Sequence, residues 1–396
     1  MVDGQVLGDG STLDLGEATV GFGPSTRTFL LSNPTSATIG LPGDSDTWLN
    51  GDARVSWSVS PPAELAPGAT ATVALSLSPD DEGPVEAVLT LPTVEPITLW
   101  LVADVHGPLP TVVVGRLGRK LLSHDYGLTW SDSQEVTDPG ADEWRDDSNL
   151  QDVTYGNGRF VAVGGSTSER IAWSDDGVVW HDVGDPDTGS LATVSFGRLA
   201  DGTPRFVATR GHDLVWSPDG ESWIREAGSA WQGLSSMAFG GDRWVGVGRF
   251  QGVTFDGQTW ASDVPDESLS QVVYGEGLFV AVGSGGRVAH SVDGIDWTEQ
   301  VLASDTNFGG VAYGNGRFVT GGWPGGQFVS EDGMTWTSEA SNELLAPLGY
   351  ANGRFVGATW RDRVWYSVDG TDWVMSQDNS SPEWAGFTSM AAATPE

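Results

Sequence analysis

Short runs in which apolar and polar residues alternate fill the first quarter of the chain. In TRTFLLSN the alternation places Phe29 and Leu31 on one face, and in RVSWSVS it does so for Val55, Trp57 and Val59. A period of two residues indicates half-buried strands. Similar runs follow in ATVALSLSP, AVLTLP and ITLWLVADV, and two further runs come earlier in the chain, so the pattern predicts about seven strands in about 100 residues.

A first domain is therefore expected over residues 1–107. Strands of this number and length, separated by turn residues, are typical of an immunoglobulin-like β-sandwich. The stretch LAPGATATVALSLSPDDEG resembles the bacterial Ig-like modules that often serve as spacers or anchors in surface proteins. The segment HGPLP, at 106–110, has the composition of a linker.

From residue 108 onward one pattern recurs. LQDVTYGNGRFVAVG, LSQVVYGEGLFVAVG and FGGVAYGNGRFVTGG each predict a strand, a tight glycine-rich turn and a second strand. A variable loop and a third strand follow, and a turn such as SVDGIDW leads into a fourth. Seven such turns occur, with tryptophans 37 to 50 residues apart. Four antiparallel strands make one propeller blade, so the chain is predicted to be all-β, with a seven-bladed β-propeller over residues 108–396.

The repeated turn has a physical explanation. Its aspartate accepts hydrogen bonds from backbone N–H groups just ahead, its glycine takes a positive φ without steric cost, and its serine adds a further local bond. The indole is expected to pack beneath the turn. The aspartates assigned this structural role are Asp125, Asp175, Asp219, Asp256, Asp293, Asp332 and Asp369.

The first repeat lacks a YGNG segment and starts directly at TVVVG, so it provides only three strands. At the other end of the chain, FTSMAAATPE aligns with LSSMAFG and no further strand follows it. We therefore expect a C-terminal strand at 387–394 to complete the first blade. Closure of this kind leaves no exposed sheet edge where the two ends of the ring meet.

The seven turns resemble those of the Asp-box, or BNR-repeat, propellers over residues 109–396. The resemblance implies a fold rather than a function, because the relatives include sialidases, xyloglucanase-type glycosidases, sortilin-like receptors, photosystem II assembly factors and lectins. The residues argue against a sialidase. All six tyrosines occupy positions within the repeats, the Arg-Ile-Pro motif is absent, and seven blades exceed the six expected for such an enzyme.

The formal net charge of -35 is shared by both predicted domains. Residues 1–108 contain 2 basic and 14 acidic groups, which gives -12, and the remaining 17 basic and 40 acidic groups give -23. An acidic surface repels phosphates and anionic membranes, so no nucleic-acid partner is expected. The sequence shows no cysteine, no signal peptide and no apolar stretch long enough for a membrane span. We expect an extracellular location, or one on a cell or particle surface.

The loops on one face of the predicted propeller vary between repeats, and we expect this variable face to bind a ligand. Its inner loops hold nine of the 17 basic groups of the propeller, and guanidinium groups bind carboxylates or phosphates in bidentate fashion. Exposed indoles can stack on sugars or anchor a protein partner. The ligand-binding candidates are Arg116, Arg119, Arg170, Arg210, Arg249, Arg287 and Arg361, with Trp144, Trp231, Trp323 and Trp384. The alternative is that the arginines pair with nearby carboxylates and that each indole covers its own loop.

No motif in the sequence indicates an active site or a metal site. The five histidines are isolated, and neither an HExxH nor a nucleophile-elbow motif occurs. No catalytic residue, metal or cofactor is therefore predicted. The leading hypothesis is a non-catalytic recognition protein whose variable face binds a glycan or a protein. Two alternatives remain: a glycoside hydrolase that uses paired carboxylates on the same face, and a structural or assembly subunit of a larger surface complex.

Overall fold

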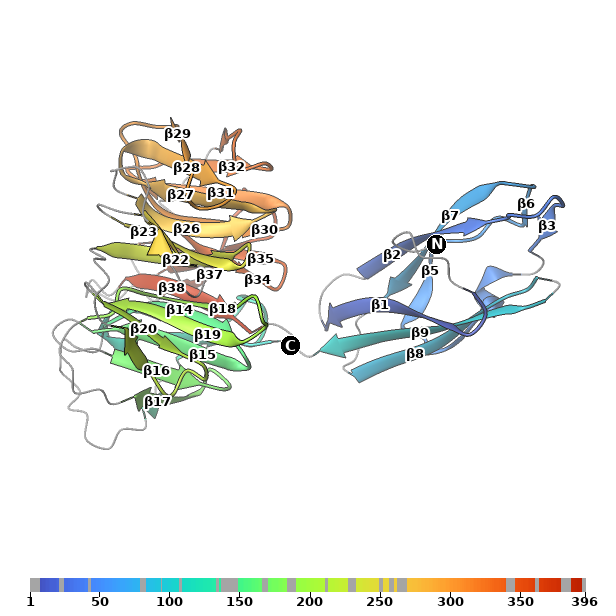
Figure 1. Cartoon of the computed structure of the whole chain (residues 1–396), viewed down its shortest axis with the longest axis horizontal. Helices are drawn as coiled ribbons and strands as arrows, with labels where there is room; N and C mark the ends of the chain where they lie inside the picture. Colours follow the sequence, from blue (N-terminus) through green and yellow to red (C-terminus); the bar gives the residue numbers. More distant parts are fainter. Residues whose placement is uncertain are drawn as a thin grey trace. The chain divides into compact units, whose positions relative to one another are not determined.

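In the computed structural model the chain forms two compact units, Met1–Pro108 and Leu109–Glu396 (Figure 1). The structure describes residues 8–20, 25–41, 44–78, 83–93, 95–106, 109–132, 135–136, 149–165, 170–183, 190–210, 213–226, 233–248, 252–255, 260–261, 269–339, 346–359, 363–378 and 386–393. Strands dominate these residues and no α-helix occurs among them, which confirms the all-β prediction. Accordingly, no helix in this part of the chain is long and apolar enough to cross a membrane.

The described part of the first unit is a β-sandwich. Its elements are β1 (Ser11–Thr19), β2 (Ser25–Ser32), β3 (Ile39–Gly40), the 3-10 turn η1 (Ser45–Trp48), β4 (Leu49–Gly51), β5 (Val55–Val59), β6 (Glu64–Leu65), β7 (Thr70–Leu77), β8 (Gly83–Leu91) and β9 (Ile97–His106). One sheet has the order β1-β9-β8-β4, a second has the order β2-β7-β5, and β3 pairs with β6. Buried residues of both larger sheets form one hydrophobic core.

The alternation in the sequence corresponds to burial along most of these strands. In β8, Val85, Ala87 and Leu89 are buried while Glu86 is exposed. The expected burial of Val59 is wrong, because this residue is 49% exposed. The pairing of β5 with β7 shifts by one residue between Trp57 and Val59. A bulge of this kind turns the following side chain away from the face that the alternation predicts.

The described part of the second unit contains seven sheets, numbered here along the chain. The first consists of β10 (Thr111–Gly115), β11 (Lys120–Ser123), β12 (Ser131–Asp132) and β38 (Phe387–Ala392), and the second of β14 (Leu150–Gly156), β15 (Arg159–Gly164), β16 (Arg170–Ser174) and β17 (Val179–Val183). The third consists of β18 (Thr193–Arg198), β19 (Pro204–Arg210), β20 (Asp213–Ser217) and β21 (Ile224–Glu226), and the fourth of β22 (Leu234–Gly240), β23 (Arg243–Gly248), β24 (Gly252–Phe255) and β25 (Trp260–Ala261).

The remaining sheets have the same order. The fifth consists of β26 (Leu269–Gly275), β27 (Leu278–Gly283), β28 (Arg287–Ser291) and β29 (Thr298–Val301), the sixth of β30 (Asn307–Gly314), β31 (Arg317–Trp323), β32 (Gln327–Ser330) and β33 (Thr337–Glu339), and the seventh of β34 (Ala346–Ala351), β35 (Arg354–Ala358), β36 (Arg363–Ser367) and β37 (Val374–Asp378). A short strand, β13 (Glu135–Val136), adds to the second sheet in parallel with β17. Two 3-10 turns, η2 (Arg116–Gly118) and η4 (Ser284–Gly286), precede third strands.

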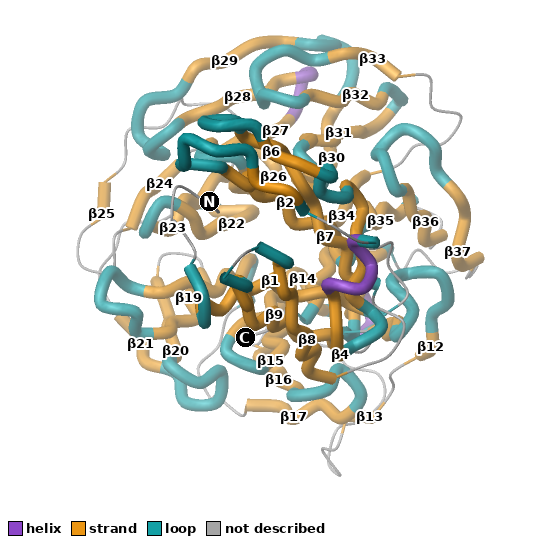
Figure 2. Tube along the Cα trace, turned by 90° about the vertical axis from the view of Figure 1, so that its right-hand side faces the viewer, coloured by secondary structure: helices purple, strands orange, loops and turns teal. Residues whose placement is uncertain are grey.

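These sheets stand around a common centre. The innermost strands contact one another in the order β38, β14, β18, β22, β26, β30 and β34, and β34 contacts β38 in turn. Figure 2 shows the outer strands, among them β17, β21, β29, β33 and β37, following one another around the rim. The second unit is therefore a β-propeller.

The second strands of the sheets are largely buried. Every residue of β10 and β27 is buried, and in β15 only Arg159 is partly exposed. Such a strand is covered by a neighbouring sheet on both faces, which explains uninterrupted apolar runs such as FVAVG.

Both ends of the second unit build its first sheet. The last strand, β38, pairs antiparallel with β10, with Val113 opposite Met390. The Thr388 hydroxyl also donates to the carbonyl of Leu150 in the second sheet (2.9 Å). Residues near 110 and near 390 therefore contribute to one hydrogen-bonded sheet.

Candidate functional site

The turns after the third strands share one hydrogen-bond pattern. In the fifth sheet, the Ser291 hydroxyl donates to Asp293 Oδ1 (3.0 Å) and accepts the N–H of Gly294 (2.8 Å). Asp293 Oδ1 also accepts two backbone N–H groups further on (2.9 and 3.0 Å), and the Trp297 indole donates to the Gly294 carbonyl (3.0 Å). Equivalent serine and backbone bonds surround the carboxylates of Asp125, Asp219, Asp332 and Asp369. Asp256 lies outside the described residues.

The role expected for Asp175 is wrong. Asp176 is the carboxylate that accepts from the Ser174 hydroxyl (3.0 Å) and from the N–H groups of Val178 and Val179 (2.8 and 3.0 Å). In the other described turns the aspartate comes two residues after the serine, and this spacing selects Asp176. The carboxylate of Asp175 instead accepts a hydrogen bond from Arg159 Nε (2.7 Å).

These turns keep their aspartates charged. The N–H groups of Thr335 and Met334 lower the pKa of Asp332 to about 2. The pKa of Asp293 is lowered in the same way, by the N–H groups of Ile295 and Asp296. Their donors are local and belong to the turn, so these carboxylates are structural groups.

Arginines at the hairpin turns join neighbouring sheets. Arg159 Nη1 donates to the carbonyl of Asp219 in the next sheet (2.7 Å), and Arg243 Nη1 donates to the carbonyl of Asp293 (3.0 Å). In the sixth sheet, Arg317 Nη1 donates to the carbonyl of Asp369 in the seventh (2.8 Å). Each arginine thus fixes the serine–aspartate turn of the following sheet.

The third strand runs from the variable face to the serine–aspartate turn, which places its first residue on the variable face. Two predicted arginines at this position pair with carboxylates of their own sheets. Arg170 Nε lies 3.4 Å from Asp182 Oδ1, and Arg287 Nη1 lies 3.8 Å from Glu299 Oε2. Both pairs retain solvent contact, and a screened pair of this type contributes little to stability.

The remaining predicted arginines have different surroundings. Arg119 begins the segment that enters β11, and its guanidinium lies over the Phe387 ring, 5.1 Å from the centroid. Arg116 is exposed, and its backbone N–H donates to the carbonyl of Gly386 (3.3 Å). Arg249, Arg361 and the side chain of Arg210 lie outside the described residues.

Trp323 is the predicted tryptophan that the structure describes, and it is 63% exposed. It ends β31 opposite Asn307, whose Oδ1 accepts the N–H of Gly285 in the fifth sheet (3.0 Å). The hydroxyl of Thr306 donates to the carbonyl of Gly325 in the loop that follows (2.9 Å). The exposed indole therefore lies at the end of a strand that is flanked by hydrogen-bonded loops of two sheets. Trp144, Trp231 and Trp384 lie outside the described residues.

Sequence reasoning missed Asp152, which links three inner strands. Its Oδ1 accepts from the Ser389 hydroxyl of β38 (2.6 Å) and from the N–H of Val153 (2.9 Å). Its Oδ2 accepts from the Thr193 hydroxyl (2.6 Å) and the N–H of Val194 (3.0 Å), both in β18. The residue as a whole is half-buried, but burial of the carboxylate among these strands raises the pKa of Asp152 in spite of its four donors.

Lys120 was also missed as a buried group. It is 2% exposed, and burial lowers the pKa of its ammonium to about 8. The ammonium donates to the carbonyl of Gly118 (3.3 Å) and lies 5.5 Å from the centroid of the Trp180 ring. The equivalent positions are Ile171 in the second sheet, Leu214 in the third and Gln327 in the sixth, so alignment of the repeats places a lysine where these sheets have apolar residues or an uncharged amide.

The described residues contain no group of three or more histidine, cysteine or acidic side chains that could hold a metal ion. On the variable face, the carboxylates of Asp182 and Glu299 already pair with arginines.

No family model and no curated protein matches the chain. Among solved structures, YCF48 bound to D1 peptide is 15% identical over 86% of this chain and 94% of that chain, with a TM-score of 0.49. YCF48 from Cyanidioschyzon merolae is 14% identical over 61% and 93%, with a TM-score of 0.47. The WD40 β-propeller domain of Doa1 is 12% identical over 60% and 84%, with a TM-score of 0.45. Likenesses of this size do not indicate what the present chain binds.

Proposed function

We propose that the second unit is a seven-bladed Asp-box propeller, closed by β38, that acts as a non-catalytic recognition module at a cell or particle surface. In this proposal the first unit is an Ig-like spacer, and the variable face of the propeller binds a glycan or a protein. The observation that carries the proposal is the exposed indole of Trp323 on its hydrogen-bonded frame.

The surroundings of Trp323 support recognition by a preformed surface. The frame that holds this indole includes η4, and Arg287 begins the strand directly after η4 with a side chain that is 31% exposed. An indole and a guanidinium on neighbouring loops offer a stacking surface and hydrogen-bond donors. Because the loops are already ordered, binding costs little conformational entropy.

The positions of the two ends of the propeller also support the variable face as the binding face. Asn352, in a hairpin turn, donates to the carbonyl of Leu109 where the chain enters the propeller (3.3 Å). The N–H of Ala393, just after β38, donates to the carbonyl of Pro110 (2.9 Å). Leu109 and Ala393, the first and last described residues of the propeller, therefore both lie at the hairpin-turn face, which is opposite the variable face.

The test uses two exposed tryptophans of one chain. Glycan arrays and purified candidate surface proteins are screened with the wild-type chain, and any ligand found is titrated against Trp323→Ala and Arg287→Ala. The control is Trp100→Ala, because Trp100 is 53% exposed in the first unit. We expect Trp323→Ala to weaken binding by about tenfold or more and Trp100→Ala to leave it unchanged.

Two results would contradict the proposal. Ligand binding that survives both Trp323→Ala and Arg287→Ala would remove the proposed site. Turnover of a bound oligosaccharide, abolished by one Asp or Glu substitution on the variable face, would establish a glycoside hydrolase instead.

A further inference from the structure

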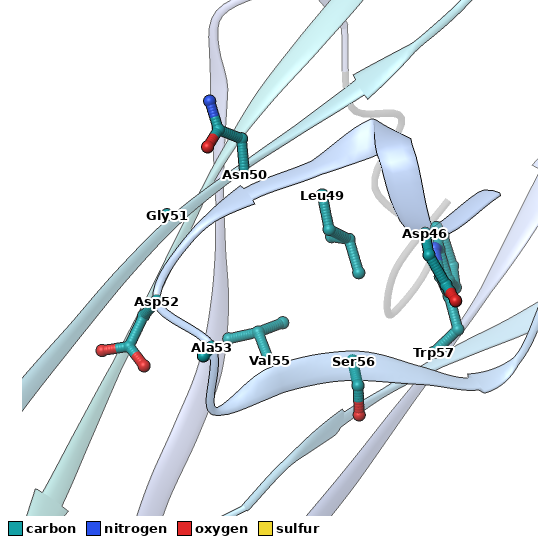
Figure 3. Close-up of a pocket in the computed structure, with 9 residues that line it drawn as sticks. All are labelled: Asp46, Leu49, Asn50, Gly51, Asp52, Ala53, Val55, Ser56 and Trp57. Atoms are coloured by element: carbon teal, nitrogen blue, oxygen red, sulfur yellow. The ribbon is translucent and has the colours of Figure 1, made fainter. Parts of the chain in front are cut away.

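The first unit contains a cavity that the propeller-based function does not use. It lies between β4 and β5, the edge strands of the two large sheets, and is closed at one end by η1. Its volume is about 330 Å³. Figure 3 shows the two strands facing each other across this space, with Leu49 and Val55 directed toward one another. The opening at the edge of the sandwich makes the cavity reachable from solvent.

The cavity has a mixed lining, in which Leu49, Val55 and Trp57 supply the apolar part and Asp46, Asn50, Asp52 and Ser56 supply polar groups. Val55 is buried, and Leu49 and Trp57 are half-buried. The Trp57 indole N–H donates to the carbonyl of Ser45 (3.0 Å), and its ring lies 6.2 Å from that of Phe29, tilted by 40°. These contacts fix the indole, so one aromatic wall of the cavity is held in place.

Two carboxylates lie at the rim of the cavity, and only one of them is paired with an arginine. Arg54 donates hydrogen bonds to Asp52 from Nε (3.0 Å to Oδ1) and from Nη2 (2.6 Å to Oδ2). These bonds lower the pKa of Asp52. Asp46 lies at the other end, beside Trp57 (Figure 3). No cationic side chain among the described residues pairs with its carboxylate. Residues 1–108 contain 2 basic and 14 acidic groups, so the unit supplies few internal cations.

We propose that this cavity binds an organic cation that has an apolar stem, with an ammonium or guanidinium as its head group. The stem packs between Leu49 and Val55, and the head lies between the Asp46 carboxylate and the Trp57 ring. A carboxylate and an aromatic face both attract such a head group, and an alkyl stem buries apolar area without hydrogen-bond demands. The negative field of the unit excludes anions.

The same chemistry has two sources, a free amine or a lysine or arginine side chain of a partner protein. The experiment is saturation-transfer NMR on the full chain with three probes: Nα-acetyl-lysine methylamide, its uncharged isostere Nα-acetyl-norleucine methylamide, and an extended peptide with one central lysine. We expect the lysine amide to bind with a Kd of roughly 1 mM, and the norleucine amide to bind at least fivefold more weakly. Binding of the peptide alone would assign the head group to a protein side chain.

Matched variants separate the site from general charge effects. Asp46→Asn should weaken the lysine probe at least fivefold, whereas Glu64→Gln, which removes an exposed carboxylate outside the cavity, should not. Trp57→Phe keeps an aromatic ring in the core and should weaken binding by a smaller factor. Equal binding of the lysine and norleucine probes, no binding of the lysine amide and the peptide, or an unaffected Asp46→Asn variant would overturn the proposal. None of these results bears on Trp323.

Discussion

Replacement of Asp152 is the sharpest test of how the propeller is held together. Asp152→Ala removes the acceptor of four hydrogen bonds, from Ser389 (2.6 Å), Thr193 (2.6 Å), Val194 (3.0 Å) and Val153 (2.9 Å). The two hydroxyls can rotate to other acceptors, but each N–H left buried without a partner costs about 1–3 kcal/mol. We expect a loss of about 2–4 kcal/mol in the free energy of unfolding, a large part of the ~5–15 kcal/mol of a typical domain.

The pH dependence gives an independent check, with Asp152→Asn as the neutral isostere. Burial raises the pKa of Asp152 in the folded chain above its ordinary value of 3.8. Folding therefore favours the protonated form of Asp152. The resulting contribution to the free energy of unfolding is fully present below pH 3.8 and is lost as the pH rises through the folded pKa. The stability of the wild type relative to Asp152→Asn should thus fall as the pH rises from about 4 through the folded pKa of Asp152.

Two measurements test this prediction. One is urea unfolding, and the other is hydrogen exchange of the backbone amides of β38. Asp152→Ala should shift the unfolding transition of the propeller and speed exchange in β38, while Asp305→Asn, at an exposed position, should do neither. A destabilisation below about 0.5 kcal/mol, or a difference between wild type and Asp152→Asn that does not change with pH, would refute the reasoning.

Three further predictions concern stability and use urea unfolding. Asp176→Ala should cost about 1–2 kcal/mol more than Asp175→Ala, because only Asp176 accepts the turn's own hydrogen bonds; equal costs would contradict the assignment. Lys120→Leu should stabilise the chain by about 1–3 kcal/mol at pH 7, because the charged lysine is disfavoured by folding below its folded pKa of about 8. That gain should shrink toward pH 11, and a constant gain would exclude the proposed cause. Arg243→Ala should cost about 1 kcal/mol through loss of its bond to the Asp293 carbonyl, and a cost of zero would show that the bond does not stabilise neighbouring sheets.

Local features could be predicted from the sequence because they depend on neighbours a few residues away. The bonds from Ser291 and Asp293 all fall within three residues, so spacing alone defines the turn. Applied strictly, the same spacing selects Asp176 rather than Asp175. The alternation in β8 likewise gives its buried face, whereas the bulge after Trp57 is a matter of strand pairing and is not encoded in alternation.

The candidate site could be predicted only in part. Composition identified the arginines and tryptophans of the variable face, but not which of them are already engaged. Arg170 and Arg287 pair with carboxylates 12 residues further along the chain, a distance at which only the pairing of strands determines contact. The exposure of Trp323 depends on loops of two sheets, so no local pattern indicates it.

The sequence by itself determined the strands, the turns and the period of the repeats, because hydrogen bonds and side-chain alternation within a few residues follow from residue type and spacing. The tertiary structure alone decided which distant groups meet. Ser389 and Asp152 are 237 residues apart and yet share a hydrogen bond of 2.6 Å. The same holds for the burial of Lys120 and the cavity beside Trp57. Contacts of this kind depend on how whole sheets are stacked, and that stacking is fixed by the summed packing of many apolar residues rather than by any single motif.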